Sequence, residues 1–583
     1  MRKRSEKKYT IIPWAAAALL LLIFSVSGDM YRDADSYEVA VVMNGILGDD
    51  NFCQYQHPLL CLMLKGIKSL LPGADCFTLF TQLITAAALG YMLKLLLSRY
   101  KDKARRICVW AAVLYIFFGV DIFGVNYTVR AAFLCYVGMT GLFGNESYPK
   151  GRVAVSTVFF LFGLMIRHQA ALLFLPFFAL AAFAEALQAY GREKDKKALK
   201  DKLGELSFRL LPWAAGCIIL MLSFVLFYSA EPYRSGILFD RARVTLADFP
   251  TEGWYELEEK AEGFDRHLYK SARLWFYADT DELTLEKLQT MAEAGRSSMF
   301  EWNAEGIAEA LAGMVLEGAN RYLTELIPML ILLLITLHKL ISGKLSPAAL
   351  TAAGAFLGCF FIILYFTVRG RALDRVWISV MLAASGHMAS MPGQDEYTRS
   401  RKKEILWLSA ISLLFFVSAM ISVVKGGKFE LHPPVTPFNA AEGADEGEFA
   451  EVYASDVHYL VCGWDSPGES AGGHFLHGWR EIQDKYRDQE KLPPKEFFEH
   501  YISSGWFGYG QDYYLTFLRE QGLENPVRAL FERDDVFLLD MSRDTVFREF
   551  FYVYLYDRYG DMSVKKVGEI DSCPVYSFRK GEK

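Results

Sequence analysis

Long apolar runs separated by charged segments fill the first 424 residues of the chain. A helix needs about 20 mainly apolar residues to cross the roughly 30 Å hydrocarbon core of a bilayer. Windows of about this length predict a polytopic α-helical membrane protein with about eleven transmembrane helices. These helices cover residues 10–27, 76–97, 107–125, 127–144, 152–166, 170–187, 210–229, 323–340, 347–367, 374–391 and 405–424. The fifth and sixth windows are short, so a pair of tilted or partly re-entrant helices is an alternative there.

Lysine and arginine residues gather on one side of these predicted helices. Clusters precede the first helix and follow the second, sixth and tenth. Because basic residues favour cytoplasmic loops, this bias predicts a multi-pass plasma-membrane protein with a cytoplasmic N-terminus. The loops 28–75 and 230–322, the turn 369–375 and the region after the last helix then lie outside. Small residues at 25–27 have the spacing of a signal-peptidase site, but the length of the first run favours a retained signal anchor.

The last part of the chain has the pattern of a soluble domain. A stretch rich in Gly, Pro, Ala and acidic residues at 425–449 predicts a linker. Residues 450–583 mix strand-like and helical segments and predict an extracytoplasmic α/β domain. The predicted strands are 451–455, 536–540 and 575–578, and the predicted helices are 496–503, 513–521 and 545–558. Cys462 and Cys573 either pair on this oxidising side or stay free, buried thiols.

Composition narrows the class of protein. Of the 583 residues, 52% are hydrophobic, 15% aromatic and 22% charged, which is too apolar for an ordinary soluble protein and too charged for one that lies in the membrane throughout. The formal net charge of -6 and the lack of a basic stripe interleaved with aromatics argue against a nucleic-acid partner. The nine cysteines lack the spacing of a zinc site, so no thiolate metal site is predicted.

The first outer loop carries carboxylates beside a predicted membrane helix. Asp29, Asp33 and Asp35 lie at its start, and the run from Tyr55 to Pro58 lies farther along it. A buried, unpaired carboxylate is costly, so these acids are expected to face solvent or a polar cavity. A carboxylate placed there can take a proton from an acceptor hydroxyl. His57 is a candidate substrate contact, although a role in shaping the turn is favoured.

Arginines at the outer ends of predicted helices run against the positive-inside trend and indicate an anionic partner. They are Arg130, Arg167, Arg369, Arg371 and Arg375. A guanidinium binds phosphate through paired, charge-assisted hydrogen bonds, so these side chains are candidate contacts for a lipid-linked phosphate. The alternative is that each one reaches lipid headgroups or pairs with a neighbouring acid.

Further candidate contacts lie close to these elements. His168, next to Arg167, is either a second phosphate contact or an interfacial histidine. Asp240 and Arg241 follow the seventh predicted helix in a segment typical of a helix on the membrane surface; they are candidate substrate contacts or solvated surface charges. Three tryptophans of the large outer loop could stack on a sugar ring, although anchoring at the membrane interface is favoured. They are Trp254, Trp275 and Trp302.

The first-loop motif resembles that of a known superfamily. The run Asp33-Ala-Asp35-Ser-Tyr37, the His57-Pro58 turn and the outer arginines are similar to the GT-C superfamily of integral-membrane glycosyltransferases, which includes protein O-mannosyltransferases and lipid A aminoarabinose transferases. On this resemblance, Asp33 is similar to the catalytic Asp and Tyr37 to the aromatic residue that accompanies it. The second acid of the family pattern is displaced to Asp35, and the turn has a single proline. Either Asp33 or Asp35 is therefore the base, and Asp33 is favoured.

The resemblance also implies a reaction. GT-C members generally transfer a sugar from a polyprenyl-phosphate donor, with inversion at the anomeric carbon, and the acceptor here would be an envelope glycan, lipid or protein. Residues 1–424 would form the GT-C-like membrane domain. Some members use a divalent metal and others do not. No cofactor or metal site is predicted for this chain, and metal ligation is the minor alternative.

Two other functions fit parts of the same pattern. A polysaccharide polymerase or ligase is also membrane-embedded with outer arginines, although such enzymes usually concentrate their functional residues in two large outer loops. A transporter is less favoured, because the chain shows no internal repeat, no paired Gly/Pro-broken helices and few acids within the predicted membrane helices.

Overall fold

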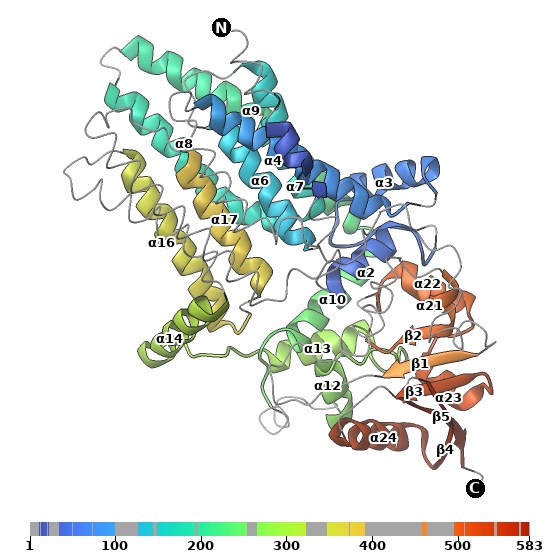
Figure 1. Ribbon diagram of the computed structural model, residues 1–583. Coiled ribbons are helices and arrows are strands. Elements are labelled where there is room, and N and C mark those ends of the chain that lie inside the picture. Colours follow the sequence, from blue (N-terminus) through green and yellow to red (C-terminus); the bar gives the residue numbers. More distant parts are fainter. Residues whose placement is uncertain are drawn as a thin grey trace.

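The computed structural model describes a large part of the predicted helical region and of the C-terminal region. Apart from residues 12, 20, 49, 73, 372, 506 and 507, the described residues are 11–22, 34–99, 126–143, 149–192, 196–253, 265–321, 347–390, 457–462, 495–540, 545–570 and 573–581. Within them the chain is mostly helical and forms a five-stranded sheet near the C-terminus (Figure 1).

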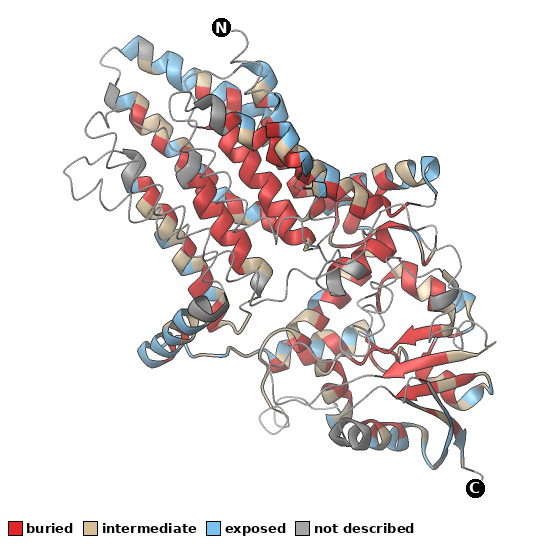
Figure 2. Cartoon of the chain, in the orientation of Figure 1, coloured by how far each residue is buried: buried red, intermediate tan, exposed pale blue. Residues whose placement is uncertain are grey.

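The helical bundle is built around α6 (Tyr127–Leu142), whose residues are all buried. A helix that is apolar all round is expected at the centre of a bundle. The helices that pack directly against it are α4 (Cys76–Arg99), α7 (Lys150–Ile166), α8 (His168–Arg192) and α17 (Asp374–Ser390). Two further helices pack on this inner group: α9 (Lys196–Tyr228) and α16 (Pro347–Val368). Figure 2 shows the resulting gradient, from a buried centre to the exposed faces of α9 and α16.

Helices α6 and α7 approach closely because glycines lie at their contact. A Cβ atom at Gly138 would lie 2.7 Å from the carbonyl oxygen of Ser156, and one at Gly163 would lie 2.6 Å from the carbonyl oxygen of Ala131. Small residues allow such close backbone approach where apolar helices pack. A larger side chain at either glycine would push the two helices apart.

Four described helices contain segments long and apolar enough to cross a membrane. They are Cys76–Leu95, His168–Tyr190, Leu199–Tyr228 and Leu350–Val368. Each falls on a predicted window, and α6, α7 and α17 form shorter helices on three more windows. The predicted helices 107–125, 323–340 and 405–424 and the linker 425–449 lie outside the described residues, as does much of the first window. The chain therefore has the apolar helices of a membrane protein, while the total of eleven stays a prediction.

Shorter helices gather at one end of the bundle (Figure 1). They are α2 (Ala34–Met43), α3 (Pro58–Leu70), α10 (Tyr233–Ala247), α12 (Arg266–Arg273), α13 (Leu285–Gly295) and α14 (Ala304–Arg321). They lie on the side of the C-terminal sheet except for α14, which packs against α16 (Figure 1). In α3, Leu60 and Leu64 are buried whereas Leu59 and Leu62 are exposed. Exposed leucines beside an apolar bundle are typical of a helix that lies along a membrane surface.

The C-terminal sheet has the strand order β2-β1-β3-β5-β4. Strand β1 pairs in parallel with β2 and β3, while β5 pairs antiparallel with β3 and β4. The strands are β1 (His458–Cys462), β2 (Tyr501–Ser503), β3 (Val536–Asp540), β4 (Met562–Ile570) and β5 (Cys573–Lys580). The helices are α21 (Lys495–His500), α22 (Asp512–Glu520), α23 (Pro526–Glu532) and α24 (Thr545–Tyr559). Helices and strands thus occur together here, as predicted.

The structure corrects one predicted helix end in the C-terminal region and decides between the two alternatives for Cys462. The predicted helix 496–503 ends at His500, because the next three residues pair with β1 as strand β2. Cys462 is a free, buried thiol, so it does not pair with Cys573. Strand β3 lies between the two strands that carry these cysteines, which keeps β1 and β5 from being neighbours. The predicted strand 451–455 lies outside the described residues.

The C-terminal region packs against the loop 230–322 through a buried carboxylate. Asp279 has no exposed surface, and its carboxylate accepts hydrogen bonds from the Asn525 side chain (2.8 Å), the Tyr554 hydroxyl (2.7 Å) and the Tyr559 hydroxyl (3.2 Å). The Tyr277 backbone N–H also donates to the Ser504 carbonyl oxygen (2.7 Å). These contacts join two segments that are about 250 residues apart in the sequence.

Candidate functional site

Three arginines from separate parts of the chain act on the charge of a fourth, Arg371, at this end of the bundle. We call Arg167, Arg243, Arg371 and Arg375 the arginine cluster. Burial lowers the pKa of Arg371; its neighbour Asp248 opposes this shift, and the positive charges of the other three arginines add to it. A cation whose pKa is lowered by like charges is held near those charges by the fold. Such an arrangement favours the arrival of an anion.

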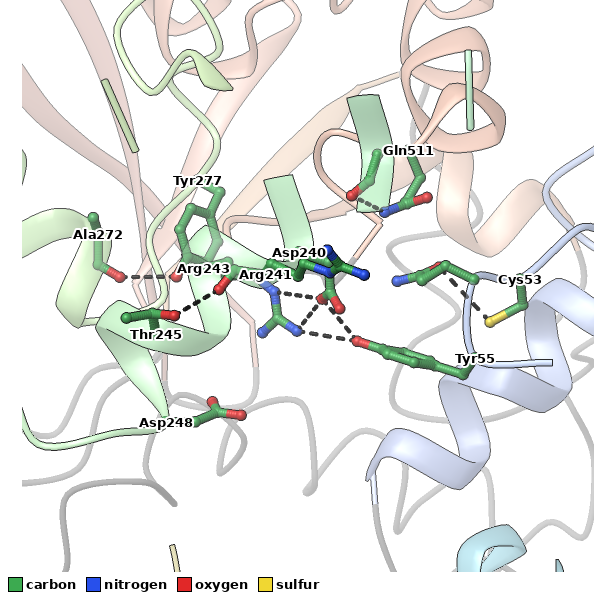
Figure 3. Close-up of polar contacts among 12 residues, drawn as sticks. Cys53, Tyr55, Asp240, Arg241, Arg243, Thr245, Asp248, Ala272, Tyr277 and Gln511 are labelled. Carbon is green, nitrogen blue, oxygen red and sulfur yellow. Dashed lines mark hydrogen bonds and ion pairs between the residues drawn. The ribbon is translucent and has the colours of Figure 1, made fainter. Parts of the chain in front are cut away.

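Hydrogen bonds with Asp240 and with Tyr55 of the first loop hold the Arg243 side chain in place (Figure 3). On α10, the Asp240 carboxylate accepts hydrogen bonds from Arg243 Nε (3.1 Å) and Nη2 (2.5 Å). The Tyr55 hydroxyl donates to the same carboxylate (2.8 Å) and accepts from Arg243 Nη2 (3.1 Å). Asp240 therefore orients Tyr55 and Arg243 rather than lying free as a surface charge.

Arg167 lies at the junction of α7 and α8, where its guanidinium faces two tyrosine rings. The distance from its guanidinium carbon is 4.7 Å to the centre of the Tyr55 ring and 5.4 Å to that of Tyr127. The Nη1 atoms of Arg167 and Arg243 are both buried and have no hydrogen-bond partner among the described residues. A buried guanidinium N–H without a partner is costly, so each of these two atoms is a donor ready for an incoming oxygen.

Arg371 and its neighbours form the other side of the cluster. Arg371 Nη2 lies 2.8 Å from an Asp248 carboxylate oxygen, and its guanidinium lies over the Phe249 ring at 4.7 Å. Arg369 Nη1 donates to the Ser298 hydroxyl (2.8 Å). Arg375 lies in the first turn of α17. The predicted group of outer arginines is thus partly assembled, with Asp248 as a partner that the sequence had not singled out.

Other predicted residues lie elsewhere or are fixed by the fold. Arg130 is buried inside the bundle, where its Nη1 donates to the Thr81 hydroxyl (2.6 Å). Arg241 is exposed on α10. The His168 ring packs on Phe224, with 4.4 Å between ring centres, and its Nδ1 is buried without a hydrogen-bond partner among the described residues.

His57 has the turn role that was favoured for it. Its Nδ1 accepts a hydrogen bond from the Leu59 N–H (3.1 Å), which caps α3, and Pro58 occupies the first helical position. Its Nε2 lies 2.9 Å from the Leu220 carbonyl oxygen of α9. His57 therefore joins the first loop to the bundle, and burial lowers its pKa.

The acids at the start of the first loop are described only in part. Asp33 and Asp29 lie outside the described residues, and for Asp35 and Tyr37 only the α2 backbone is described. Between these two, the Ser36 hydroxyl accepts a hydrogen bond from the Tyr127 N–H (3.4 Å). Because the Tyr127 ring faces Arg167, the first turn of α2 begins beside the arginine cluster.

Asp50 is a first-loop carboxylate that the sequence argument missed. It is half-buried, accepts a hydrogen bond from the Phe52 N–H (3.1 Å), and lies 3.4 Å from the Tyr233 hydroxyl. Burial raises the pKa of Asp50, and the negative charge of Asp512 contributes. The sequence places Asp50 in the first loop, but only the tertiary contacts show that its side chain is sheltered from water.

This raised pKa predicts a pH-dependent effect of Asp50 on stability. Since the folded state holds the proton more tightly than the unfolded state, stability falls as pH rises from the unfolded pKa through the folded one. We expect Asp50→Asn to raise the melting temperature by about 1–2 °C at pH 7 and to leave it unchanged at pH 3. Thermal unfolding of the purified protein at both pH values measures this. An equal shift at the two values would contradict a charge effect.

Tyr55, Arg243 and Asp248 are the main residues that sequence reasoning passed over. Arg243 follows Asp240 by three positions, the spacing of an ion pair on one helix face, and this signal could have identified it. Tyr55 and Asp248 gave no local signal, because their partners are distant in the sequence. Within the described residues, no group of three or more His, Cys, Asp or Glu side chains is arranged to hold a metal ion.

Comparison of the chain with protein-family models, with curated proteins and with solved structures finds no match in any of the three.

Proposed function

We propose that the protein transfers a sugar from a polyprenyl-phosphate donor to an envelope acceptor at the outer face of the plasma membrane. The observation that carries the proposal is the arginine cluster, in which Arg167 and Arg243 each keep a buried N–H without a partner. The cluster lies where apolar helices end, so a lipid phosphate can meet it while its chain stays among those helices. The first-loop motif supplies the candidate base, and Ser36 of this motif contacts Tyr127, whose ring faces Arg167.

The proposed reaction is a displacement at the anomeric carbon. The carboxylate of Asp33 or Asp35 takes the proton of the acceptor hydroxyl, and the hydroxyl oxygen bonds to the anomeric carbon. The bond from that carbon to the phosphate oxygen breaks, and its electron pair stays on the phosphate. The products are the glycosylated acceptor, with inverted anomeric configuration, and polyprenyl phosphate. Residues from the first loop thus act on one side of the sugar and arginines on the other.

The cluster would favour this reaction through the change in charge on the phosphate. The donor is a phosphodiester with one negative charge, and the departing polyprenyl phosphate gains a second as the bond breaks. Preorganised guanidinium groups bind the more negative species better, and only such differential binding accelerates the chemical step. Asp240 and Asp248 keep Arg243 and Arg371 in place so that the cost of orienting them is met during folding.

Removal of Arg167 tests the proposal. The purified protein in lipid nanodiscs would receive undecaprenyl-phosphate mannose, glucose or galactose and an envelope extract as acceptor, and released undecaprenyl phosphate would be measured. We expect release with at least one donor, and a loss of about 10²-fold in Arg167→Ala, because one charge-stabilising donor is removed.

Arg579→Ala is the matched control, because the Arg579 side chain is 76% exposed on strand β5. It removes the same charge far from the cluster and should retain full release. The proposal fails if no donor releases undecaprenyl phosphate in the wild-type protein, or if Arg167→Ala releases it as fast as the control.

A further inference from the structure

Trp275 occupies a backbone position that glycine holds elsewhere in this protein. Helix α12 closes with a hydrogen bond from the Phe276 N–H to the Ser271 carbonyl oxygen (3.0 Å), which leaves Trp275 at φ 58°. The same bond across five residues closes α16 and α22, where Gly370 (φ 72°) and Gly522 (φ 65°) occupy this position. Glycine is preferred here because an L side chain is strained in the left-handed region.

Trp275 is the one described non-glycine residue with a positive φ, and contacts on both sides hold it there. The Tyr277 N–H donates to the Ser504 carbonyl oxygen (2.7 Å), and the Tyr277 hydroxyl donates to the Ala272 carbonyl oxygen (2.8 Å). Local strain persists only where the surroundings determine the conformation, and such positions cluster at functional sites. A bulky residue kept at a glycine position therefore requires a reason beyond closing the helix.

The surroundings of Trp275 supply that reason. The guanidinium carbon of Arg243 lies 4.4 Å from the centre of the indole ring. Arg243 is only 2% exposed, while Trp275 is half-buried, so the ring covers the arginine and keeps part of its own surface open. An indole surface thus adjoins the Nη1 donor that has no partner among the described residues.

We propose that Trp275 is the stacking platform for the sugar of the lipid-linked donor, an inference that rests on the function proposed above. In a glycosyl phosphate the pyranose ring is joined directly to the phosphate, so a site for it needs an apolar face beside an anion contact. The open part of the indole offers the face, and Arg243 offers the anion contact. Aromatic rings bind the C–H face of a pyranose through dispersion and burial of apolar area.

Four lipid probes, one without a sugar and three that carry different sugars, test this assignment. The full-length protein in nanodiscs would be titrated with radiolabelled undecaprenyl phosphate and with undecaprenyl-phosphate mannose, glucose and galactose. The variants are Trp275→Gly and Trp275→Asn, which suit the left-handed backbone, and Trp275→Phe, which keeps an aromatic face. The readout is the affinity for each glycosylated lipid divided by the affinity for bare undecaprenyl phosphate. A general loss of folded protein does not change this ratio.

The bare lipid phosphate carries one more negative charge than a glycosylated lipid, so the affinity ratio of each variant is compared with that of the wild-type protein. Trp275→Gly and Trp275→Asn should lose about tenfold of the affinity for at least one glycosylated lipid and keep the affinity for the bare lipid phosphate, and Trp275→Phe should keep most of both. A ratio that is unchanged from the wild type in the glycine and asparagine variants for every glycosylated lipid would overturn the role of Trp275 and leave the proposed function standing. Binding of none of the four lipids would instead overturn the proposed function.

Discussion

The proposed sugar transfer is expected to fall by roughly 10³-fold when Asp33 and Asp35 are both replaced by asparagine. An amide cannot accept the proton of the acceptor hydroxyl, so the base is lost while the size of each side chain is kept. The first turn of α2, which carries Asp35, begins beside Tyr127 and hence beside Arg167. In the proposed mechanism donor binding depends mainly on the arginine cluster, so it should change much less than the rate of transfer.

Release of undecaprenyl phosphate and binding of the donor measure these two quantities separately. The single variants Asp33→Asn and Asp35→Asn identify the base, because only one of them should reproduce the full loss. Glu286→Gln, an exposed carboxylate on α13, is the matched control and should transfer at the wild-type rate. Transfer by the double variant at the rate of this control would remove the first-loop acids from the mechanism.

Replacement of Asp279 by alanine is expected to release the C-terminal region from the loop 230–322. Asp279 is fully buried and accepts hydrogen bonds from three side chains, so its loss leaves Asn525, Tyr554 and Tyr559 without this acceptor in a site closed to water. Because unsatisfied buried polar groups are costly, the contact should weaken by about 3–5 kcal/mol. That is comparable to a large part of the stability of a typical domain.

Limited proteolysis and thermal unfolding test this second prediction. A protease should cut Asp279→Ala faster than the wild-type protein between the loop 230–322 and the C-terminal strands. The variant should also melt at a lower temperature than the wild type. Asp281→Ala, two positions away, removes an exposed ion pair with Arg528 and should cost no more than about 1 kcal/mol. Equal behaviour of the two variants would show that Asp279 does not hold the C-terminal region in place.

The helices were predictable because they follow from local patterns. Apolar runs of sufficient length marked α4, α8, α9 and α16, and these are the helices whose composition suits a membrane. His57-Pro58 marked the start of α3, since a capping side chain followed by proline is a local signal. The predicted helix end at Ser503 was wrong, because Tyr501–Ser503 form strand β2, which exists only through its pairing with β1, distant in the sequence.

The sequence indicated the type of residue at the candidate site, but not which residues come together there. The sequence singled out arginines at predicted helix ends, and two of these, Arg167 and Arg375, act on the charge of a third, Arg371; their role in binding an anion stays a prediction. The sequence did not show which arginines lie close together. Arg130 donates to Thr81 inside the bundle, whereas Arg243, which was not a candidate, belongs to the cluster. Trp275 was interpreted mainly as an interfacial anchor, but its ring packs on Arg243.

The sequence by itself determined the apolar helices, the mixture of helices and strands after them, and the first-loop motif, because each of these depends on residues close together in the chain. Only the tertiary structure decided that Tyr55 joins Asp240 and Arg243 in one hydrogen-bond network and that Asp279 holds the C-terminal region to the loop 230–322. The physical reason is that hydrogen bonds and charge interactions act over a few ångströms, whereas Tyr55 lies 185 residues from Asp240, and Asp279 lies 246 residues from Asn525, along the chain. Packing of the helices creates that proximity, and the chemistry of the site depends on it.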